Sequence, residues 1–174
     1  MIPFHIIGQP GSGKTTLIVD LIGEMVKTGI TVGSIKHSSH AHELDKPGKD
    51  SFLHRQAGAA PVTMMTRDLA AVYLPRTRNM TPDAVMKKFY PHLDIVLIEG
   101  WISGPHDKIE IWRETVKKPL LFMDVPRVRA IITDDLLDPK IKKQVNALNI
   151  SCFKRNAITE ITAFLKKKSQ GRNR

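Results

Sequence analysis

The residues with the clearest chemistry form a glycine-rich stretch near the start of the chain. Residues 8–15 read G-Q-P-G-S-G-K-T and fill every fixed position of the pattern G-x-x-x-x-G-K-[ST]. Glycines leave room for backbone N–H groups to turn inward around phosphate oxygens at the N-terminus of a helix. Lys14 would place its charge on the β- and γ-phosphates, and the Thr15 hydroxyl would bind Mg²⁺. The predicted nucleotide-binding residues are Gly8, Pro10, Gly11, Ser12, Gly13, Lys14, Thr15 and Thr16.

A carboxylate after a buried strand is the second candidate for phosphate chemistry. The apolar run at 94–98, D-I-V-L-I, is typical of a central parallel strand, and Glu99 follows it directly. Because Mg²⁺ prefers oxygen ligands, Glu99 would hold the ion with Thr15, directly or through water. Asp45 is a further metal candidate, with a solvated acidic loop as the alternative. Asp94 begins the strand, so we expect it at the opposite edge of the sheet in a structural role.

The segment 36–60 is dense in charged groups and contains four histidines. Ligands of parallel sheets bind beyond the carboxyl ends of strands, so this segment should project over the same edge as the glycine-rich loop. A zinc site is one interpretation, but the spacing is irregular and no cysteine lies among the histidines, which favours binding of phosphate or of a polyanionic partner. Lys108 and Arg113 would meet phosphates of a second substrate or be ordinary surface cations. The substrate or partner candidates are Lys36, His37, His40, Asp50, Arg55, Lys108 and Arg113.

These side chains need strands and helices that bring them to one edge. Residues 4–7 form an apolar strand that ends at the glycine-rich loop. After the loop, apolar residues at spacings of three and four predict a helix that ends near Gly29. Helix starts are predicted where a capping residue precedes proline. The other predicted elements are strands at 31–35, 94–98 and 130–133, helices starting at Thr81, Asp138 and Asn156, and an antiparallel hairpin of 62–66 with 71–74.

The alternation of strands and helices predicts an α/β fold. We expect the three-layer α/β/α architecture of P-loop NTPases, with a mainly parallel sheet and a β-hairpin extension. A length of 174 residues suits one nucleotide-binding domain, placed at 1–165. The residues 166–174 are rich in Lys and Arg and have no acidic residue, so a flexible basic tail is expected there.

Charge and composition narrow the classes of function. Basic residues outnumber acidic ones by 27 to 17, which invites a nucleic-acid hypothesis. No aromatic-rich basic strand or zinc spacing accompanies this charge, so it fits a protein that handles phosphates better. The single cysteine, Cys152, points away from an oxidising compartment, and neither a secretory signal nor a membrane-length apolar run is found. We therefore expect a cytoplasmic protein that binds neither nucleic acid nor membrane.

Several of these motifs occur together in one known family. The glycine-rich loop is shared by many NTPases, whereas D-K-P-G-K-D-S at 45–51, followed by R-x-A-G-A at 55–59, is specific. The motifs I-K-H-x-x-H at 35–40, I-E-G at 98–100 and K-I-E-I-x-R at 108–113 complete the pattern. On these residues the chain resembles the molybdopterin-guanine dinucleotide biosynthesis protein B family, MobB.

The resemblance implies a GTP-binding adapter in molybdenum cofactor biosynthesis that uses Mg²⁺. It further implies a homodimer with weak GTPase activity that works on molybdopterin beside a MobA-type guanylyltransferase. A carboxylate after a late strand would accept the N1–H and 2-amino donors of guanine, which adenine lacks, and Asp135 aligns best with that position. The N-K-x-D signature of many GTPases is absent. The alternative is a small-molecule kinase or ATP-dependent ligase, which also joins a phosphate loop to a basic acceptor site.

Overall fold

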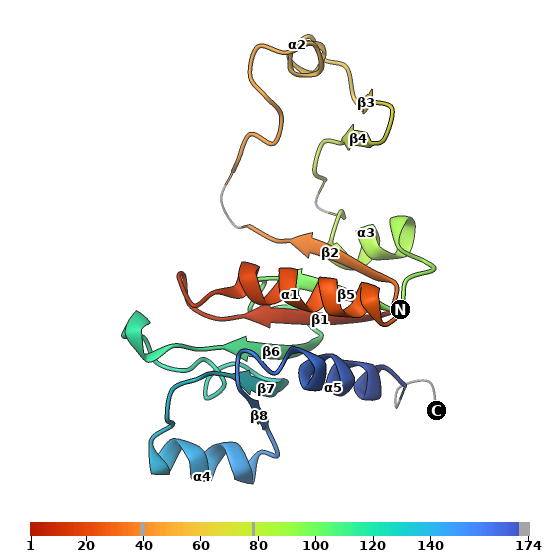
Figure 1. The fold of residues 1–174 in the computed structure, drawn as a ribbon. Helices are drawn as coiled ribbons and strands as arrows, with labels where there is room; N and C mark the ends of the chain where they lie inside the picture. The colour runs from red at the N-terminus through yellow and green to blue at the C-terminus, as the bar shows by residue number, and fades with distance from the viewer. Residues whose placement is uncertain (39–40, 78, 171–174) are drawn as a thin grey trace. The chain divides into compact units, whose positions relative to one another are not determined.

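The computed structural model describes residues 1–38, 41–77 and 79–170 of the chain (Figure 1). These residues group into two compact units. Unit 1 comprises Met1–Ser38 and Met86–Arg174, and unit 2 comprises Ser39–Val85. In unit 2 the apolar side chain of Val62 is buried, whereas many others are exposed. Because a domain needs a hydrophobic core of its own, we keep the single domain at 1–165 as a prediction.

A parallel sheet forms the centre of unit 1, and it confirms the predicted α/β architecture. In the described residues this sheet has six strands in the order β2-β5-β1-β6-β7-β8. All of its pairings are parallel. The carboxyl ends of its strands therefore lie at one edge (Figure 1). The strands are β1 (Ile2–Ile7), β2 (Val32–Lys36), β5 (Ile95–Glu99), β6 (Asp107–Ile111), β7 (Val128–Ile132) and β8 (Ser151–Phe153).

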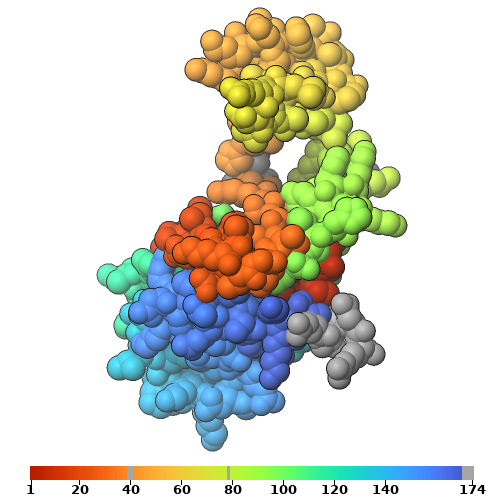
Figure 2. Space-filling model, turned by 45° about the vertical axis from the view of Figure 1, so that its right-hand side comes forward, coloured from red at the N-terminus to blue at the C-terminus, as the bar shows by residue number. Residues whose placement is uncertain are grey.

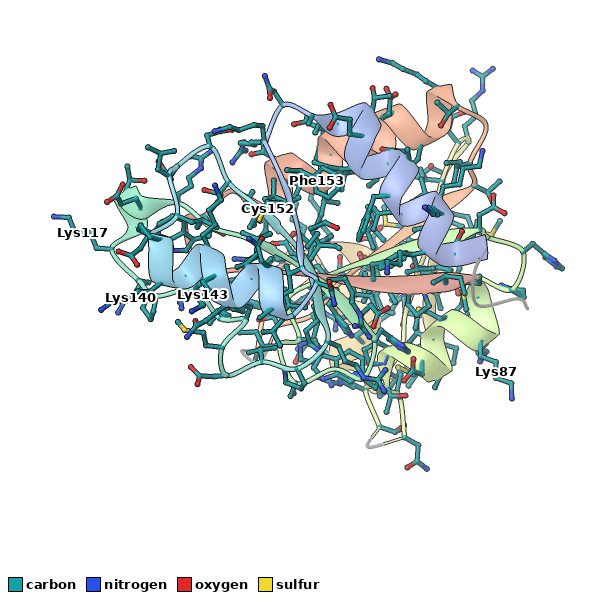
Figure 3. The ribbon with its side chains drawn as sticks, turned by 90° about the horizontal axis from the view of Figure 1, so that it is seen from below. Lys87, Lys117, Lys140, Lys143, Cys152 and Phe153 are labelled. Atoms are coloured by element: carbon teal, nitrogen blue, oxygen red, sulfur yellow. The ribbon has the colours of Figure 1, made fainter. Side chains whose placement is uncertain are left out.

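One face of this sheet is covered by α1 (Lys14–Lys27) and α5 (Ile158–Gln170). Their buried apolar side chains form one core with Phe4 and Ile6 of β1. Figure 2 shows the surfaces of α1 and α5 next to each other. The ring of Phe153 in β8, labelled in Figure 3, lies 5.4 Å from the Phe164 ring of α5.

The opposite face is covered by α3 (Pro82–Phe89) and α4 (Pro139–Ala147). Successive side chains of a strand point to opposite faces, so Ile7 packs with Val145 of α4 rather than with α1. Met86 of α3 packs with Val96 and Ile98 of β5 on the same principle. Helices on both faces of the sheet produce the predicted three layers.

Two of the predicted helix starts are confirmed with their caps, whereas α5 begins at Ile158, two residues after the predicted Asn156. The Asp138 carboxylate accepts a hydrogen bond from the Lys140 N–H at 2.8 Å, and the Thr81 hydroxyl accepts one from the Ala84 N–H at 3.2 Å. Helix α5 continues to Gln170, so Lys166–Lys168 are helical rather than part of a flexible tail. No helix among the described residues has the length and apolar character needed to cross a membrane.

Strand β6 was not predicted, because its sequence, DKIEI, alternates charged and apolar residues. The structure buries the whole strand. Each charged side chain has a partner: Asp107 lies 3.1 Å from the Arg129 guanidinium, the Lys108 ammonium donates to the Gly104 carbonyl at 2.7 Å, and the Glu110 carboxyl accepts from the Leu121 N–H at 2.6 Å. Buried charges are tolerated when they are paired or hydrogen-bonded. The strand could not be predicted because these partners are distant in sequence or lie in an irregular loop.

Unit 2 contains α2 (Asp50–Gln56) and the hairpin of β3 (Val62–Met65) with β4 (Ala70–Tyr73). The two strands pair antiparallel, as predicted. At their turn the Thr66 N–H donates to the Leu69 carbonyl at 2.8 Å, and the Thr66 hydroxyl accepts from the Leu69 N–H at 3.0 Å. The hairpin therefore closes through its own backbone and the Thr66 side chain.

Candidate functional site

The glycine-rich loop, residues 8–13, joins β1 to α1 at the carboxyl edge of the sheet. Gly11 and Gly13 have φ angles of 80° and 97°, which L side chains rarely adopt. At Gly8 a Cβ would collide with the Ile111 carbonyl of neighbouring β6. The conformation thus requires glycine at these positions, and the loop lies between strand and helix as predicted.

Lys14 opens α1 and folds its side chain back over the loop. Its ammonium donates to the Gly8 carbonyl at 2.9 Å and to the Gln9 carbonyl at 3.0 Å. Partial burial lowers the pKa of Lys14, the Glu99 carboxylate opposes this effect, and Lys36 adds to it. The structure therefore holds a partly desolvated cation at the mouth of the loop, where it is suited to an anionic ligand.

Thr15 and Glu99 meet on the β5 side of the loop. The Thr15 hydroxyl donates to Glu99 Oε1 at 3.1 Å, and the Lys36 ammonium lies 3.7 Å from the same oxygen. Parallel pairing places Glu99 beside both Ile6 of β1 and Lys36 of β2. In the described part of the chain no three His, Cys, Asp or Glu side chains gather to hold a metal. A hydroxyl and a carboxylate fit Mg²⁺, which commonly takes its other oxygens from phosphate and water.

A cavity of about 160 Å³ opens on the other side of the loop, beyond β6 and β7. Asp135, Arg113 and Trp112 line it. Asp135 Oδ2 accepts a hydrogen bond from the Glu114 N–H at 2.8 Å and so holds the short 3₁₀ turn Glu114–Val116. The other polar residues that line the cavity are Thr115, Thr133, Asp134 and Arg155.

His37 follows β2 and stays near the loop edge. Its backbone N–H donates to the Glu99 carbonyl at 3.0 Å, and its ring stacks on Trp101 at 5.6 Å between centroids. The other predicted histidine, His40, lies outside the described residues. Trp101 also contacts the buried ring of His5, edge to face at 5.3 Å. The rings of His37, Trp101 and His5 thus form one connected cluster, which the His37 backbone joins to Glu99.

Lys108 lies away from that edge. It is the second residue of β6, pairs in register with His5, and is 1% exposed. Its ammonium donates to the Gly104 and His106 carbonyls at 2.7 and 3.2 Å. Burial and the nearby Arg127 lower its pKa. The Lys108 ammonium is therefore hydrogen-bonded to backbone carbonyls, whereas Arg113 from the same motif lines the cavity.

The candidates Asp45 and Arg55 contact each other inside unit 2. Asp45 Oδ1 accepts from the Ser51 hydroxyl at 3.0 Å, and Asp45 Oδ2 lies 3.6 Å from Arg55 Nε. The Arg55 guanidinium also bonds to the Glu43 carboxylate and lies over the Tyr73 ring, 5.2 Å from its centroid. Burial and the Asp45 charge raise the pKa of Tyr73. The motif at 45–59 thus builds a linked cluster, and Asp50 lies exposed in the first turn of α2.

Sequence reasoning missed Trp112, Thr115 and Arg155. Trp112 and Thr115 follow β6, whose alternating pattern hid the strand. Arg155 follows β8, which has only three residues. A systematic search for polar residues after each strand would have found all three, had β6 and β8 been recognised.

The family model of molybdopterin guanine dinucleotide synthesis protein B matches residues 4–134. A molybdopterin-guanine dinucleotide biosynthesis adapter protein of Haemophilus influenzae is 38% identical over 120 residues, which are 68% of this chain and 67% of the relative. The adapter protein of the same name from Escherichia coli is 35% identical over 112 residues, 60% of this chain and 61% of the relative.

Solved structures show the same fold over nearly the whole chain. A MobB protein homologue from Bacillus stearothermophilus superposes with a TM-score of 0.67 at 23% identity and covers 98% of this chain and 99% of its own. Bacillus subtilis MobB superposes with a TM-score of 0.69 at 21% identity and covers 94% and 97%. The architecture therefore extends beyond the segment that sequence comparison aligns.

Proposed function

The chain belongs to the molybdopterin guanine dinucleotide synthesis protein B family, and we propose that it is a GTP-binding adapter in molybdopterin guanine dinucleotide synthesis. Its relatives from H. influenzae and E. coli are named adapter proteins of this biosynthesis. The observation that carries the proposal is that three features suited to a nucleotide lie at the same edge of the sheet. A hydroxyl–carboxylate pair, the phosphate loop and a cavity with a carboxylate wall lie there in this order.

The phosphates of GTP would lie on the loop 8–15. Its backbone N–H groups at the start of α1 favour anions, and Lys14 supplies a cation that the loop already holds in place. Thr15 and Glu99 would hold Mg²⁺ on the β5 side. When bound there, Mg²⁺ would neutralise negative charge on the terminal phosphates.

The guanine base would enter the cavity beside Asp135. One oxygen of this carboxylate holds the Glu114 N–H, and the carboxylate keeps acceptor capacity for the N1–H and 2-amino groups of guanine. Adenine presents no such pair of donors on that edge. Asp135 would thus select GTP over ATP.

As an adapter, the chain would work with molybdopterin and a MobA-type guanylyltransferase, and its own GTP hydrolysis would be slow. No catalytic glutamine or arginine finger could be assigned from the sequence, so turnover should fall far below the roughly 1–100 s⁻¹ of kinases. A homodimer is part of the proposal, because the hairpin of unit 2 exposes Met65 by 78% and Leu69 by 76%. Exposed apolar groups of this kind favour association.

Calorimetric titration with GTP, GDP and ATP, with and without Mg²⁺, tests the nucleotide part. We expect GTP to bind more tightly than ATP and Mg²⁺ to strengthen GTP binding. In Glu99→Gln the effect of Mg²⁺ should shrink while the GTP-to-ATP ratio stays unchanged, because the base is not touched. Preference for ATP, with consumption of ATP and an acceptor in equal amounts, would show a kinase or ligase instead.

The adapter part requires a reconstituted reaction. Formation of molybdopterin guanine dinucleotide by a MobA-type guanylyltransferase should increase when this chain is added. The Lys14→Ala variant should lose that stimulation if bound GTP is needed. Equal product with and without the chain would refute the adapter role.

A further inference from the structure

Arg155 lies between the phosphate loop and the cavity. Its guanidinium Nη1 donates to the Ser12 carbonyl of the loop at 3.4 Å. A Cβ at Gly13 would collide with the same guanidinium, so loop and side chain are in close contact. Arg155 also lines the cavity that Asp135 borders. One planar cation thus contacts both parts of the proposed nucleotide site.

The position of Arg155 is set by the sheet. Its backbone N–H donates to Asp134 Oδ1 at 2.9 Å, which ties the turn after β8 to the end of β7. The neighbouring Lys154 ammonium donates to the Asp134 carbonyl at 2.8 Å. The bond from the Arg155 N–H fixes the backbone at this residue, and the Arg155 side chain is left to extend toward the loop.

The strand order decides which end of a nucleotide Arg155 can meet. Strands β5 and β8 lie on opposite sides of β1. Glu99 ends β5 and bonds to Thr15, so the metal and the terminal phosphates belong on that side. Arg155 approaches from the β8 side, where the cavity opens. The base of a nucleotide bound in this way would lie nearer to Arg155 than its γ-phosphate.

We propose that Arg155 is a base-contacting residue whose guanidinium plane packs against the face of a bound purine. This inference rests on the proposed nucleotide-binding function. A guanidinium is planar and weakly hydrated, and it is attracted to the face of an aromatic ring. Guanine and adenine both offer such a face, so Arg155 contributes affinity for either base, whereas Asp135 selects between them. Its bond to the Ser12 carbonyl links the base cavity to the phosphate loop.

The test compares binding of GTP, GDP, ATP and inorganic tripolyphosphate by calorimetry. In Arg155→Leu, affinity for the three nucleotides should fall about tenfold, the size expected for a desolvated cation–π contact. Affinity for tripolyphosphate, which has no base, should stay unchanged. Lys143→Leu is the control, since it removes an exposed cation of α4 that does not line the cavity, and all four affinities should stay near those of the wild type.

Arg155→Lys keeps the positive charge but lacks the planar guanidinium. It replaces the leucine variant in the test if circular dichroism shows that Arg155→Leu does not fold. It should bind nucleotides about threefold more weakly and tripolyphosphate as tightly as the wild type. An equal loss for tripolyphosphate would assign Arg155 to the phosphates and overturn the proposal, as would unchanged nucleotide affinity. If the wild-type chain binds none of the nucleotides, the proposed function itself fails, and this inference fails with it.

Discussion

Lys14 is the side chain on which phosphate binding should depend most directly. Its ammonium is held by two loop carbonyls and is no part of the apolar core. We therefore expect Lys14→Ala to keep the fold and to lose about a hundredfold in GTP affinity, the size of a charge-assisted hydrogen-bond set. Calorimetry with circular dichroism measures both, and Lys27→Ala in the last turn of the same helix is the control. Unchanged affinity in a folded Lys14→Ala variant would remove the basis of the nucleotide site.

Asp135 has a structural role in the turn and a proposed role toward the base, and the two can be separated. In Asp135→Asn the amide oxygen can still accept from the Glu114 N–H, while the amide N–H₂ group replaces an acceptor with a donor. Preference for GTP over ATP should fall about tenfold to a hundredfold, because the guanine donors lose their acceptor. Xanthosine triphosphate carries a carbonyl at the 2-position and should gain affinity. Competition binding measures these ratios.

The control for this prediction is Asp134→Asn, because exposed Asp134 holds the Arg155 N–H and lies one residue away. It should leave the GTP-to-ATP ratio intact. If Asp135→Asn keeps full preference for GTP, another group reads the base.

At the scale of elements, β6 carries a carboxyl group that makes stability depend on pH. Burial raises the pKa of Glu110 from its ordinary 4.5 to about 7, although its oxygens accept from the Leu121 and Phe122 N–H groups at 2.6 and 3.0 Å. Between these values the folded protein keeps a proton that the unfolded chain releases. The free energy of unfolding should therefore fall as pH rises from about 5 to about 7, by roughly 3 kcal/mol, and then level off.

Urea denaturation at a series of pH values measures this slope. Glu110→Gln cannot titrate, so its slope over the same range should be flatter by that amount. Glu114→Gln, at an exposed position that follows the same strand, should behave like the wild type. Equal slopes for the wild type and Glu110→Gln would show that Glu110 titrates normally.

At the scale of the whole molecule, the proposed homodimer depends on the exposed hairpin. Met65 and Leu69 lie at its turn end and expose most of their apolar surface. If that surface is buried between two copies, Leu69→Lys should weaken the dimer at least about tenfold, since a lysine loses the apolar contact and repels its symmetry mate. Sedimentation over a range of concentrations measures the change. Val19→Lys on α1, an equally radical change at another exposed apolar site, should have no effect.

Local chemistry explains why part of the fold could be predicted. The glycine-rich loop, the apolar strand before Glu99 and the proline-marked starts at Pro82 and Pro139 depend on neighbours in the sequence. The same reasoning placed Asp94 correctly at the amino edge, where its carboxylate accepts from the Thr31 N–H and hydroxyl at 2.8 and 2.7 Å. It failed for β6, because a strand of alternating charge is normally half exposed, and here distant partners bury it.

The phosphate loop, the α/β class and the carboxylate that ends β5 could be predicted without a structure, because each of these depends on spacing along the chain. Which distant groups meet is visible only in the folded chain. It pairs Thr15 with Glu99 across 84 positions, commits Lys108 to carbonyls, and joins Arg155 to a loop 143 positions away. Such contacts depend on strand order, register and burial together. The spacing of the contacting residues along the chain reveals none of these three.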